Sequence, residues 1–386
     1  MAVEIKRVET KRQLEQFIQL HYDLYRGNDY DAPNLYIDEV RTLSPFLKKQ
    51  NPAFEFCDTE YYLALRDQQV VGRVAAIINR RYNEQWNRPC VRFGWLDLVD
   101  DEEVMRALLK AVEDFGRRNG MKEVIGPLGF TDMDPEGMLT YGFDELGTMA
   151  TIYNYPYYPQ LMERMEGYEK DNNYVEYKVF VPKEGMPDKF RRVAELTMKR
   201  YNLHVVKITK KDVFGPRQYG LRVFDVINRT FESLYGYSKM TENQIKEYID
   251  RYFNALDFEL LCFVEDWNTP DHDLVGVGIT IPSLSRALQK CRNGRFLPFG
   301  WWHLLRALKM KKTDIVDCLL IGVLPEYRAK GANALLFYDL IPIYQKYGFK
   351  WGESHVEMET NGKVQNQWSY LDHELHKRRR CYKKAL

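Results

Sequence analysis

The sequence predicts an α/β protein built from two units of similar size. The chain has 386 residues, which at roughly 100–200 residues per domain is enough for two domains. A similar order of predicted helices, hairpin and strands occurs in each half. A cluster of turn residues at 182–187, Pro-Lys-Glu-Gly-Met-Pro, separates the halves. We therefore expect one domain over residues 1–182 and a second over residues 183–386.

Apolar spacing places the elements of the first half. Side chains at helical spacing indicate helices, and short β-branched or aromatic runs bounded by turn residues indicate strands. Asp100 followed by Glu103 resembles a capping box, and Gly120 ends the helix behind it. The expected elements are a helix over 11–25, a hairpin of 61–65 and 70–79, a strand over 91–99, a helix over 104–115, a strand over 121–128, a helix over 160–165 and a strand over 174–181.

The second half follows the same rules. Pro342 falls inside one predicted helix and should kink it. The expected elements are helices over 188–201 and 242–253, a hairpin of 259–264 and 274–281, a strand over 314–324, a helix over 333–347, a strand over 351–358, a helix over 364–371 and a strand over 378–383.

Composition restricts the class of protein. The formal net charge is +1, so no global field attracts nucleic acid or membrane. The six cysteines are scattered, without a CxxC pair, which favours free thiols in a reducing compartment and predicts no metal site. The first residues lack an apolar signal-peptide core, and no apolar run approaches the ~18 residues of a membrane span. We expect a cytoplasmic protein.

The segment from Gly322 to Asn333, Gly-Val-Leu-Pro-Glu-Tyr-Arg-Ala-Lys-Gly-Ala-Asn, joins a nearly all-apolar strand to a helix. A helix amino terminus offers unpaired N–H groups and the positive end of a dipole. Gly331 allows close approach of a ligand, and Arg328 and Lys330 add positive charge. Such a turn suits a pyrophosphate.

This segment resembles the acyl-CoA motif of the GNAT (Gcn5-related N-acetyltransferase) superfamily, R/Q-x-x-G-x-G/A. Arg328 and Gly331 match the motif, whereas Asn333 stands where a second Gly or Ala is usual. The resemblance implies two GNAT-like units, each a mixed, mostly antiparallel sheet flanked by helices, and acetyl-CoA or another acyl-CoA as co-substrate. It implies that the strand pairs with the pantetheine arm and that the loop amides hold the pyrophosphate. The implied donor-binding residues are Leu320, Ile321, Gly322, Val323, Arg328, Ala329, Lys330, Gly331, Ala332 and Asn333.

Residues 356–361 resemble the fifth strand of the family and the asparagine that follows it. Many members carry a tyrosine seven residues after that asparagine as the acid for the leaving thiolate, and this chain has Trp368 there. Indole cannot act as an acid. Strand alternation would place Glu353, His355, Glu357 and Glu359 on one face, which could line a cleft for a cationic substrate or be a solvated strand face. The candidate catalytic residues are Glu357, Glu359 and Asn361.

The first half resembles a degenerate second unit. Its equivalent junction, residues 98–103, has no glycine or basic residue and carries four consecutive acids, which would repel a pyrophosphate. We therefore expect a single donor site, in the second half. Residues 126–159 resemble a segment of tandem-GNAT bacterial proteins of unassigned substrate, and its tyrosines at 153–158 could line an acceptor pocket or pack between the units.

Two basic stretches remain. Residues 283–313 contain eight Lys or Arg, no acid, and Phe296, Phe299, Trp301 and Trp302. This insertion could cover the donor site, contact the coenzyme's 3′-phosphate, lie on a membrane surface or be a solvated basic helix. The tail, 377–384, has six Lys or Arg in eight positions. It could be a nucleic-acid patch, but an edge strand protected by charge is the favoured interpretation.

These observations predict an acyl-CoA-dependent N-acyltransferase, with acetyl as the expected group, acting by direct attack of a small-molecule or peptide amine. One alternative is an aminoacyltransferase of the related two-unit type that uses aminoacyl-tRNA, supported only by the basic insertion. The other is a non-catalytic acyl-CoA-binding protein, supported by Trp368.

Overall fold

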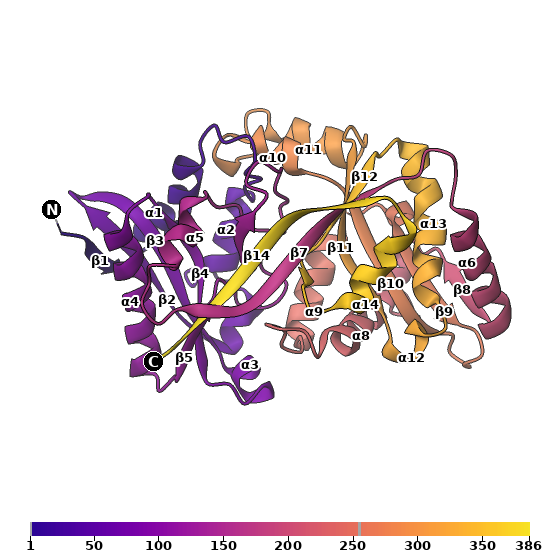
Figure 1. Cartoon of the computed structure of the whole chain (residues 1–386), viewed down its shortest axis with the longest axis horizontal. Helices are drawn as coiled ribbons and strands as arrows, with labels where there is room; N and C mark the ends of the chain where they lie inside the picture. The colour runs from indigo at the N-terminus through magenta and orange to yellow at the C-terminus, as the bar shows by residue number, and fades with distance from the viewer. Residues whose placement is uncertain (1, 254–255) are drawn as a thin grey trace.

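A computed structural model describes residues 2–253 and 256–386. The molecule has two lobes joined by two long strands that cross between them (Figure 1). Strands of both lobes form a continuous sheet in the order β1-β2-β3-β4-β5-β14-β7-β12-β11-β10-β9-β8. We call β1 to α5 the first unit and α6 to α14 the second unit, with β7 and β14 between them.

The first unit has an antiparallel arrangement from β1 to β4, and β5 pairs parallel to β4. Helix α4 packs on this sheet through Val104, Leu108 and Val112, which have no exposed surface. The elements are β1 (Glu4–Arg7), α1 (Lys11–Leu24), α2 (Tyr36–Leu43), β2 (Cys57–Arg66), β3 (Gln69–Asn79), α3 (Arg80–Gln85), β4 (Cys90–Leu98), α4 (Glu102–Arg118), β5 (Glu123–Gly126), β6 (Met138–Tyr141) and α5 (Tyr157–Met162).

The second unit repeats this plan. Strands β8 to β11 are antiparallel and β12 pairs parallel to β11. Leu335, Leu336 and Leu340 of α13 are buried in its core. The elements are α6 (Asp188–Tyr201), β8 (Leu203–Val206), α7 (Lys210–Phe214), α8 (Tyr219–Phe231), α9 (Glu242–Tyr248), β9 (Leu261–Asp266), β10 (Asp273–Pro282), α10 (Ser285–Gln289), α11 (Gly300–Leu308), β11 (Ile315–Val323), α12 (Pro325–Arg328), α13 (Ala332–Tyr347), β12 (Trp351–Ser354), β13 (Glu357–Met358) and α14 (Gly362–Gln365).

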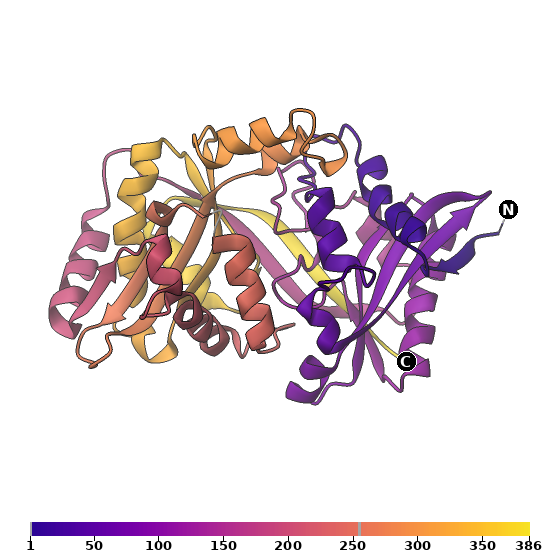
Figure 2. The same cartoon turned by 180° about the vertical axis from the view of Figure 1, so that it is seen from behind.

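Strands β7 (Glu169–Phe180) and β14 (His373–Ala385) connect the units. They pair antiparallel along most of their length, from His373 opposite Val179 to Lys383 opposite Glu169. The far end of β14 pairs with β5 of the first unit, and β7 pairs with β12 of the second. The two shared strands therefore join the strands of both units into one sheet, and both views show them crossing between the lobes (Figures 1 and 2).

The fold class is confirmed, and the predicted helices and hairpins are found close to the expected bounds. The tail prediction is wrong, because β14 lies in the middle of the sheet and not at an edge. Its Lys377 and Arg379 are buried and paired with acids of neighbouring strands. The predicted strand over 351–358 is interrupted after Ser354, and the helix cap of α4 is Asp101 and not Asp100.

No helix among the described residues is long and apolar enough to cross a membrane. The predicted boundary after residue 182 falls in the segment between β7 and α6. Because β14 extends to the first unit, the division into domains 1–182 and 183–386 stays a prediction.

Candidate functional site

Strands β11 and β12 of the second unit pair over only part of their length. They pair only from Ile315 opposite Trp351 to Cys318 opposite Ser354, after which β12 ends. Strand β11 continues to Val323 and pairs with β10 on its other side, with a register shift opposite Ile279 and Thr280. No backbone pairing within the described residues covers the second edge of β11 beyond Cys318. This edge leaves N–H and C=O groups that an extended ligand chain can pair with.

The turn after β11 presents a helix amino terminus. Gly331 has φ +82° and is the N-cap of the long helix α13, without a capping side chain. The Gly331 amide donates to the Arg328 carbonyl, and the Lys330 carbonyl accepts a hydrogen bond of 3.0 Å from the Thr197 hydroxyl. The Ala334 amide donates to the Gly331 carbonyl at 2.9 Å, whereas the amides of Ala332 and Asn333 have no acceptor among the described residues and are available to an anion.

Two cations flank this turn. The side chain of Arg328 is exposed, and its Nε donates to the Val323 carbonyl at 2.9 Å. Lys330 Nζ lies 4.0 Å from the ring centroid of Tyr327, whose hydroxyl donates to Asp266. The structure thus brings the predicted donor-binding residues 320–323 and 328–333 together at one end of β11.

Several buried oxygens near the open edge of β11 and the start of α13 have no hydrogen-bond partner within the described part of the chain. They are Thr230 Oγ1, Asn333 Oδ1 and Glu357 Oε2. Thr230 lies against Gly322 of β11, and Asn333 is in the first turn of α13. Because buried polar groups are normally paired, such atoms are expected where a ligand binds.

Glu357 is the candidate catalytic residue with the most unusual environment. Its Oε1 accepts a hydrogen bond of 2.8 Å from Trp368 Nε1, while Oε2 is buried and unpaired among the described atoms. Burial raises the pKa of Glu357 to about 8, although the Trp368 hydrogen bond opposes this shift. Trp368 itself is buried against Phe337 of α13. A carboxyl group with this pKa can exchange a proton near neutral pH.

The other acids of the predicted face have different surroundings. Glu359 pairs with Arg378 at 2.6 Å and Asn173 at 2.8 Å, and these bonds hold its pKa below the usual value. Asn361 forms the turn into α14, where its amide donates to the Met358 carbonyl. Glu353 faces the interior. The prediction of one acidic face is wrong because the strand breaks between Ser354 and Glu357.

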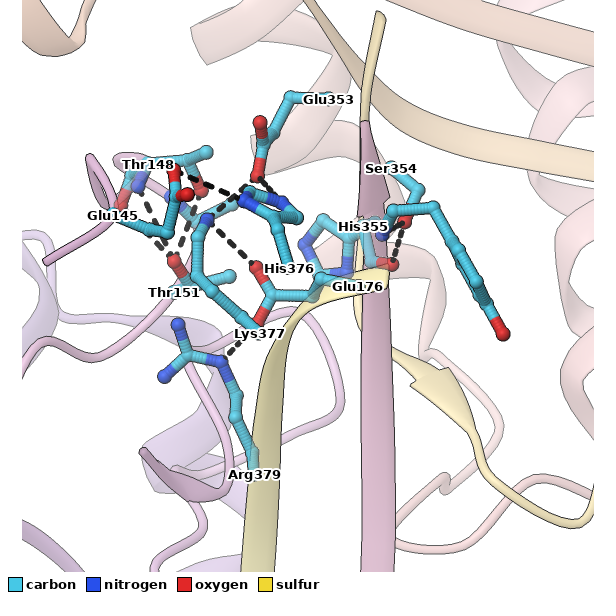
Figure 3. A network of polar contacts seen from close by, with 12 residues as sticks. Glu145, Thr148, Thr151, Glu176, Glu353, Ser354, His355, His376, Lys377 and Arg379 are labelled. Atoms are coloured by element: carbon cyan, nitrogen blue, oxygen red, sulfur yellow. Dashed lines mark hydrogen bonds and ion pairs between the residues drawn. The ribbon is translucent and has the colours of Figure 1, made fainter. Parts of the chain in front are cut away.

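Glu353 belongs to a buried charge network where β7, β12 and β14 meet (Figure 3). Lys377 Nζ lies 2.6 Å from Glu353 Oε1 and 3.2 Å from Glu176 Oε2. Arg379 also pairs with Glu176. Removing one member of such a network would leave a buried charge uncompensated, at a cost of about 3–5 kcal/mol. The network joins the shared strands to the second unit.

His355 and His376 lie beside this network (Figure 3). His376 Nε2 is 2.7 Å from Glu353 Oε1, and its other ring nitrogen is 3.4 Å from Glu145. Burial lowers the pKa of His355 to about 4, so this imidazole is neutral at pH 7. Sequence spacing alone did not reveal the network, because its members come from strands that are distant in the chain.

At the equivalent junction of the first unit, other parts of the chain bond to the backbone of β4. Strands β4 and β5 pair from Cys90 to Arg92, and the Leu128 amide then donates to the Phe93 carbonyl at 2.8 Å. At the end of β4, the Leu98 amide donates to the Tyr158 hydroxyl and the Tyr157 hydroxyl donates to the Leu98 carbonyl.

The amino terminus of α4, the helix that follows β4, is also capped by a side chain. The Asp101 side chain accepts hydrogen bonds from the Glu103 and Val104 amides at 2.9 and 3.2 Å. A capping carboxylate at this position both uses the free amides and repels an anion. The first unit thus offers no counterpart of the α13 turn.

The first unit contains a pocket beside the end of β4, which Leu96 and Asp97 of this strand help to line. His21 lies in it, 3.2 Å from both Asp31 and Asp97. These carboxylates raise the pKa of His21 to about 10 against the effect of burial. Tyr153 and Tyr158 of the predicted aromatic cluster line the pocket. The pocket is lined further by Ile18, Tyr22, Trp95, Pro127, Met138, Met149 and Ile152.

Among the described residues, no group of three or more His, Cys, Asp or Glu side chains could hold a metal ion. All six cysteines are free and buried.

Comparisons with known proteins agree with this architecture. A bacterial ceramide synthase from Caulobacter vibrioides is 25% identical over 395 residues, covering 98% of this chain and 96% of that protein. Protein YghO from Escherichia coli is 23% identical over 380 residues, covering 97% and 94%. No protein-family model matches the chain.

A solved tandem GNAT protein from the clavulanic acid biosynthesis pathway aligns with 99% of this chain and 98% of its own. The TM-score is 0.56 at 12% identity. This likeness shows the fold. The chain is a tandem protein of the GNAT acyltransferase fold, as the motif at 322–333 predicted.

Proposed function

We propose that this protein is an N-acyltransferase that moves an acyl group from an acyl-CoA thioester to an amine. The observation that carries the proposal is the open edge of β11, which the short helix α12 and the turn at 329–331 join to the uncapped amino terminus of α13. An extended pantetheine arm would pair with residues 320–323, and the pyrophosphate would bind at Gly331, with Arg328 and Lys330 supplying positive charge.

In the proposed reaction the amine nitrogen attacks the thioester carbonyl, the new C–N bond forms and the C–S bond breaks. The attacking amine must lose a proton, and Glu357 accepts it at Oε2. Its raised pKa supports this role. Glu359 is held by Arg378 and Asn173, and its lowered pKa makes it a weaker base. The proton on the departing thiolate comes from solvent or from protonated Glu357.

The acceptor in this proposal is a long-chain amine. Support comes from the ceramide synthase relative, since a ceramide is the N-acyl derivative of a long-chain amino alcohol and the similarity covers almost the whole of both chains. The same relative favours a long-chain acyl group over acetyl.

Calorimetric titration with CoA tests the donor site. We expect Arg328→Glu to weaken CoA binding by about 10–100-fold, because a hydrogen bond to a charged group contributes about 1.5–3 kcal/mol. Arg12→Glu, at an exposed position of α1 in the first unit, is the matched control and should bind like the wild type. Unchanged affinity in Arg328→Glu, with the fold intact by circular dichroism, would refute the site.

Thiol release tests the reaction. The wild type is given acyl-CoA donors of increasing chain length and a panel of amines that includes long-chain amino alcohols. We expect release that depends on the amine and rises with acyl length. Tight CoA binding without release in any combination would favour the non-catalytic binder, which the tryptophan at position 368 supports.

A further inference from the structure

A short segment of the second unit concentrates exposed apolar side chains. Leu297 and Phe299 are 75% and 69% exposed, and the indoles of Trp301 and Trp302 are nearly half exposed. We call this surface the α11 face; it consists of Phe296, Leu297, Phe299, Trp301, Trp302, Leu305 and Met310, all of them exposed. Isolated apolar residues are common on protein surfaces, but a contiguous group marks an interaction site.

Helix α11 is apolar on both of its sides. Gly300 and Ala307 are buried against the body of the protein, with Leu304 half-buried between them. Trp301, Trp302 and Leu305 fall on the opposite side. A surface helix normally turns polar side chains outward. The outward side of α11 is therefore suited to an apolar contact that the chain itself does not provide.

Positive charge surrounds the α11 face. Residues 283–313 contain eight Lys or Arg and no Asp or Glu, although the net charge of the whole chain is only +1. Arg292, Arg306 and Lys312 are exposed and form no ion pair with any described residue. Exposed indoles and basic residues around an apolar surface are the features of a helix that lies in a membrane interface.

The insertion is fixed to the first unit. Gln289 Nε2 donates to the carbonyls of Asp29 and Asp31, and the Arg295 guanidinium lies over the Tyr36 ring. Helices α10 and α11 consequently lie along one long side of the molecule, over the region where the two units meet (Figures 1 and 2). This attachment presents the α11 face in a defined orientation.

We propose that the α11 face docks on the surface of a bilayer that contains anionic lipids. Charge complementarity favours this occupant, since each basic residue near an anionic surface strengthens attachment. A second copy of the chain fits less well, because a two-fold contact would bring the same basic residues against each other. The inference stands without the proposed reaction, but a membrane-docked enzyme would take a long-chain amine from the same surface.

Sedimentation with vesicles tests the proposal on the full chain. Vesicles of phosphatidylcholine alone are compared with vesicles that also contain phosphatidylglycerol. We expect binding to the mixed vesicles, weakened by salt, and a blue shift of tryptophan fluorescence. Lack of binding to the mixed vesicles would overturn the proposal.

Variants locate the contact. Trp301→Ser with Trp302→Ser should abolish most of the binding, and Arg306→Glu with Lys312→Glu should weaken it by about fivefold or more for each charge. Leu196→Ser with Phe214→Ser, at exposed apolar positions outside the α11 face, is the matched control. Equal losses in the control would refute the assignment.

Two further outcomes would also overturn the proposal that the α11 face docks on a membrane. Self-association of the wild type without vesicles, lost in Trp301→Ser with Trp302→Ser, would assign the face to a second copy. Tight binding of RNA with no vesicle binding would assign it to nucleic acid. CoA affinity, measured in the same variants, should not change. A result that refutes membrane docking by the α11 face therefore leaves the proposed CoA site untouched.

Discussion

At the end of β4 in the first unit, two tyrosine hydroxyls bond to the backbone of Leu98, and Asp101 caps the helix that follows. At the end of β11 in the second unit, the corresponding edge is open and Gly331 begins the helix without a side-chain cap. Both junctions have the same strand-to-helix topology. The difference shows that such a unit keeps its fold when its own tyrosines bond to the end of the strand, because their hydroxyls supply the hydrogen bonds of the Leu98 backbone.

The charges follow the same division. The first junction carries four consecutive acids, whereas the second has Arg328 and Lys330. We therefore expect only the second to attract a pyrophosphate. In our proposal the acyl transfer takes place in the second unit. The first unit pairs with the shared strands and contains the pocket around His21.

Replacing the proposed base is the strongest way to break this comparison. Glu357→Gln keeps the shape of the side chain but cannot accept a proton, so we expect kcat to fall by about 10²–10⁴-fold. In the wild type the rate should rise with pH and level off above about 8, because the carboxylate form is the active one. Steady-state kinetics across pH measure both effects.

The matched control is Glu136→Gln in the first unit. Glu136 is also buried, its Oε2 is unpaired within the described part of the chain, and burial raises its pKa. If only the second unit is catalytic, this variant keeps kcat. A comparable loss in Glu136→Gln would show that both units contribute to the reaction.

A glycine substitution sharpens the comparison at the donor turn. Gly331→Ala adds a Cβ that would lie 2.9 Å from Thr197 Oγ1, at φ +82°. We expect CoA affinity to fall by about tenfold, because the turn must shift away from the geometry that presents its amides. Calorimetric titration measures the change.

Gly348→Ala at the other end of α13 provides the control. Gly348 has φ +75° and open space around its Cβ position, so the backbone strain is similar, about 1 kcal/mol. Gly348→Ala should lose stability through backbone strain alone and Gly331→Ala also through the contact with Thr197, but only Gly331→Ala should lose CoA affinity. Equal affinities in the two variants would remove the turn from the donor site.

The sequence predicted the parts of the site that are local. The strand, turn and helix at 315–347 follow from adjacent residues, so their order could be predicted, and the donor-binding role of the turn stays a prediction. The exchange of β7 and β14 between the units was not predictable, because an apolar strand pattern does not specify its partner. The basic residues of β14 suggested an edge strand for the same reason, since Glu176 and Glu353 neutralise Lys377 from distant positions.

The smallest expected effect concerns the hydrogen bond that Trp368 donates to Glu357. In the first unit tyrosines bond to the strand end, whereas in the second this indole bonds to the proposed base. The bond stabilises the carboxylate and so lowers its pKa. Trp368→Phe removes the donor, and we expect the inflection of the pH–rate profile to move to higher pH by up to about one unit, since a net hydrogen bond is worth about 0.5–1.5 kcal/mol.

Trp351→Phe is the control, because Trp351 Nε1 is buried without a described partner and the change leaves Glu357 untouched. A shift to lower pH in Trp368→Phe, or an equal shift in both variants, would mean that the ionisation seen in the kinetics is not that of Glu357.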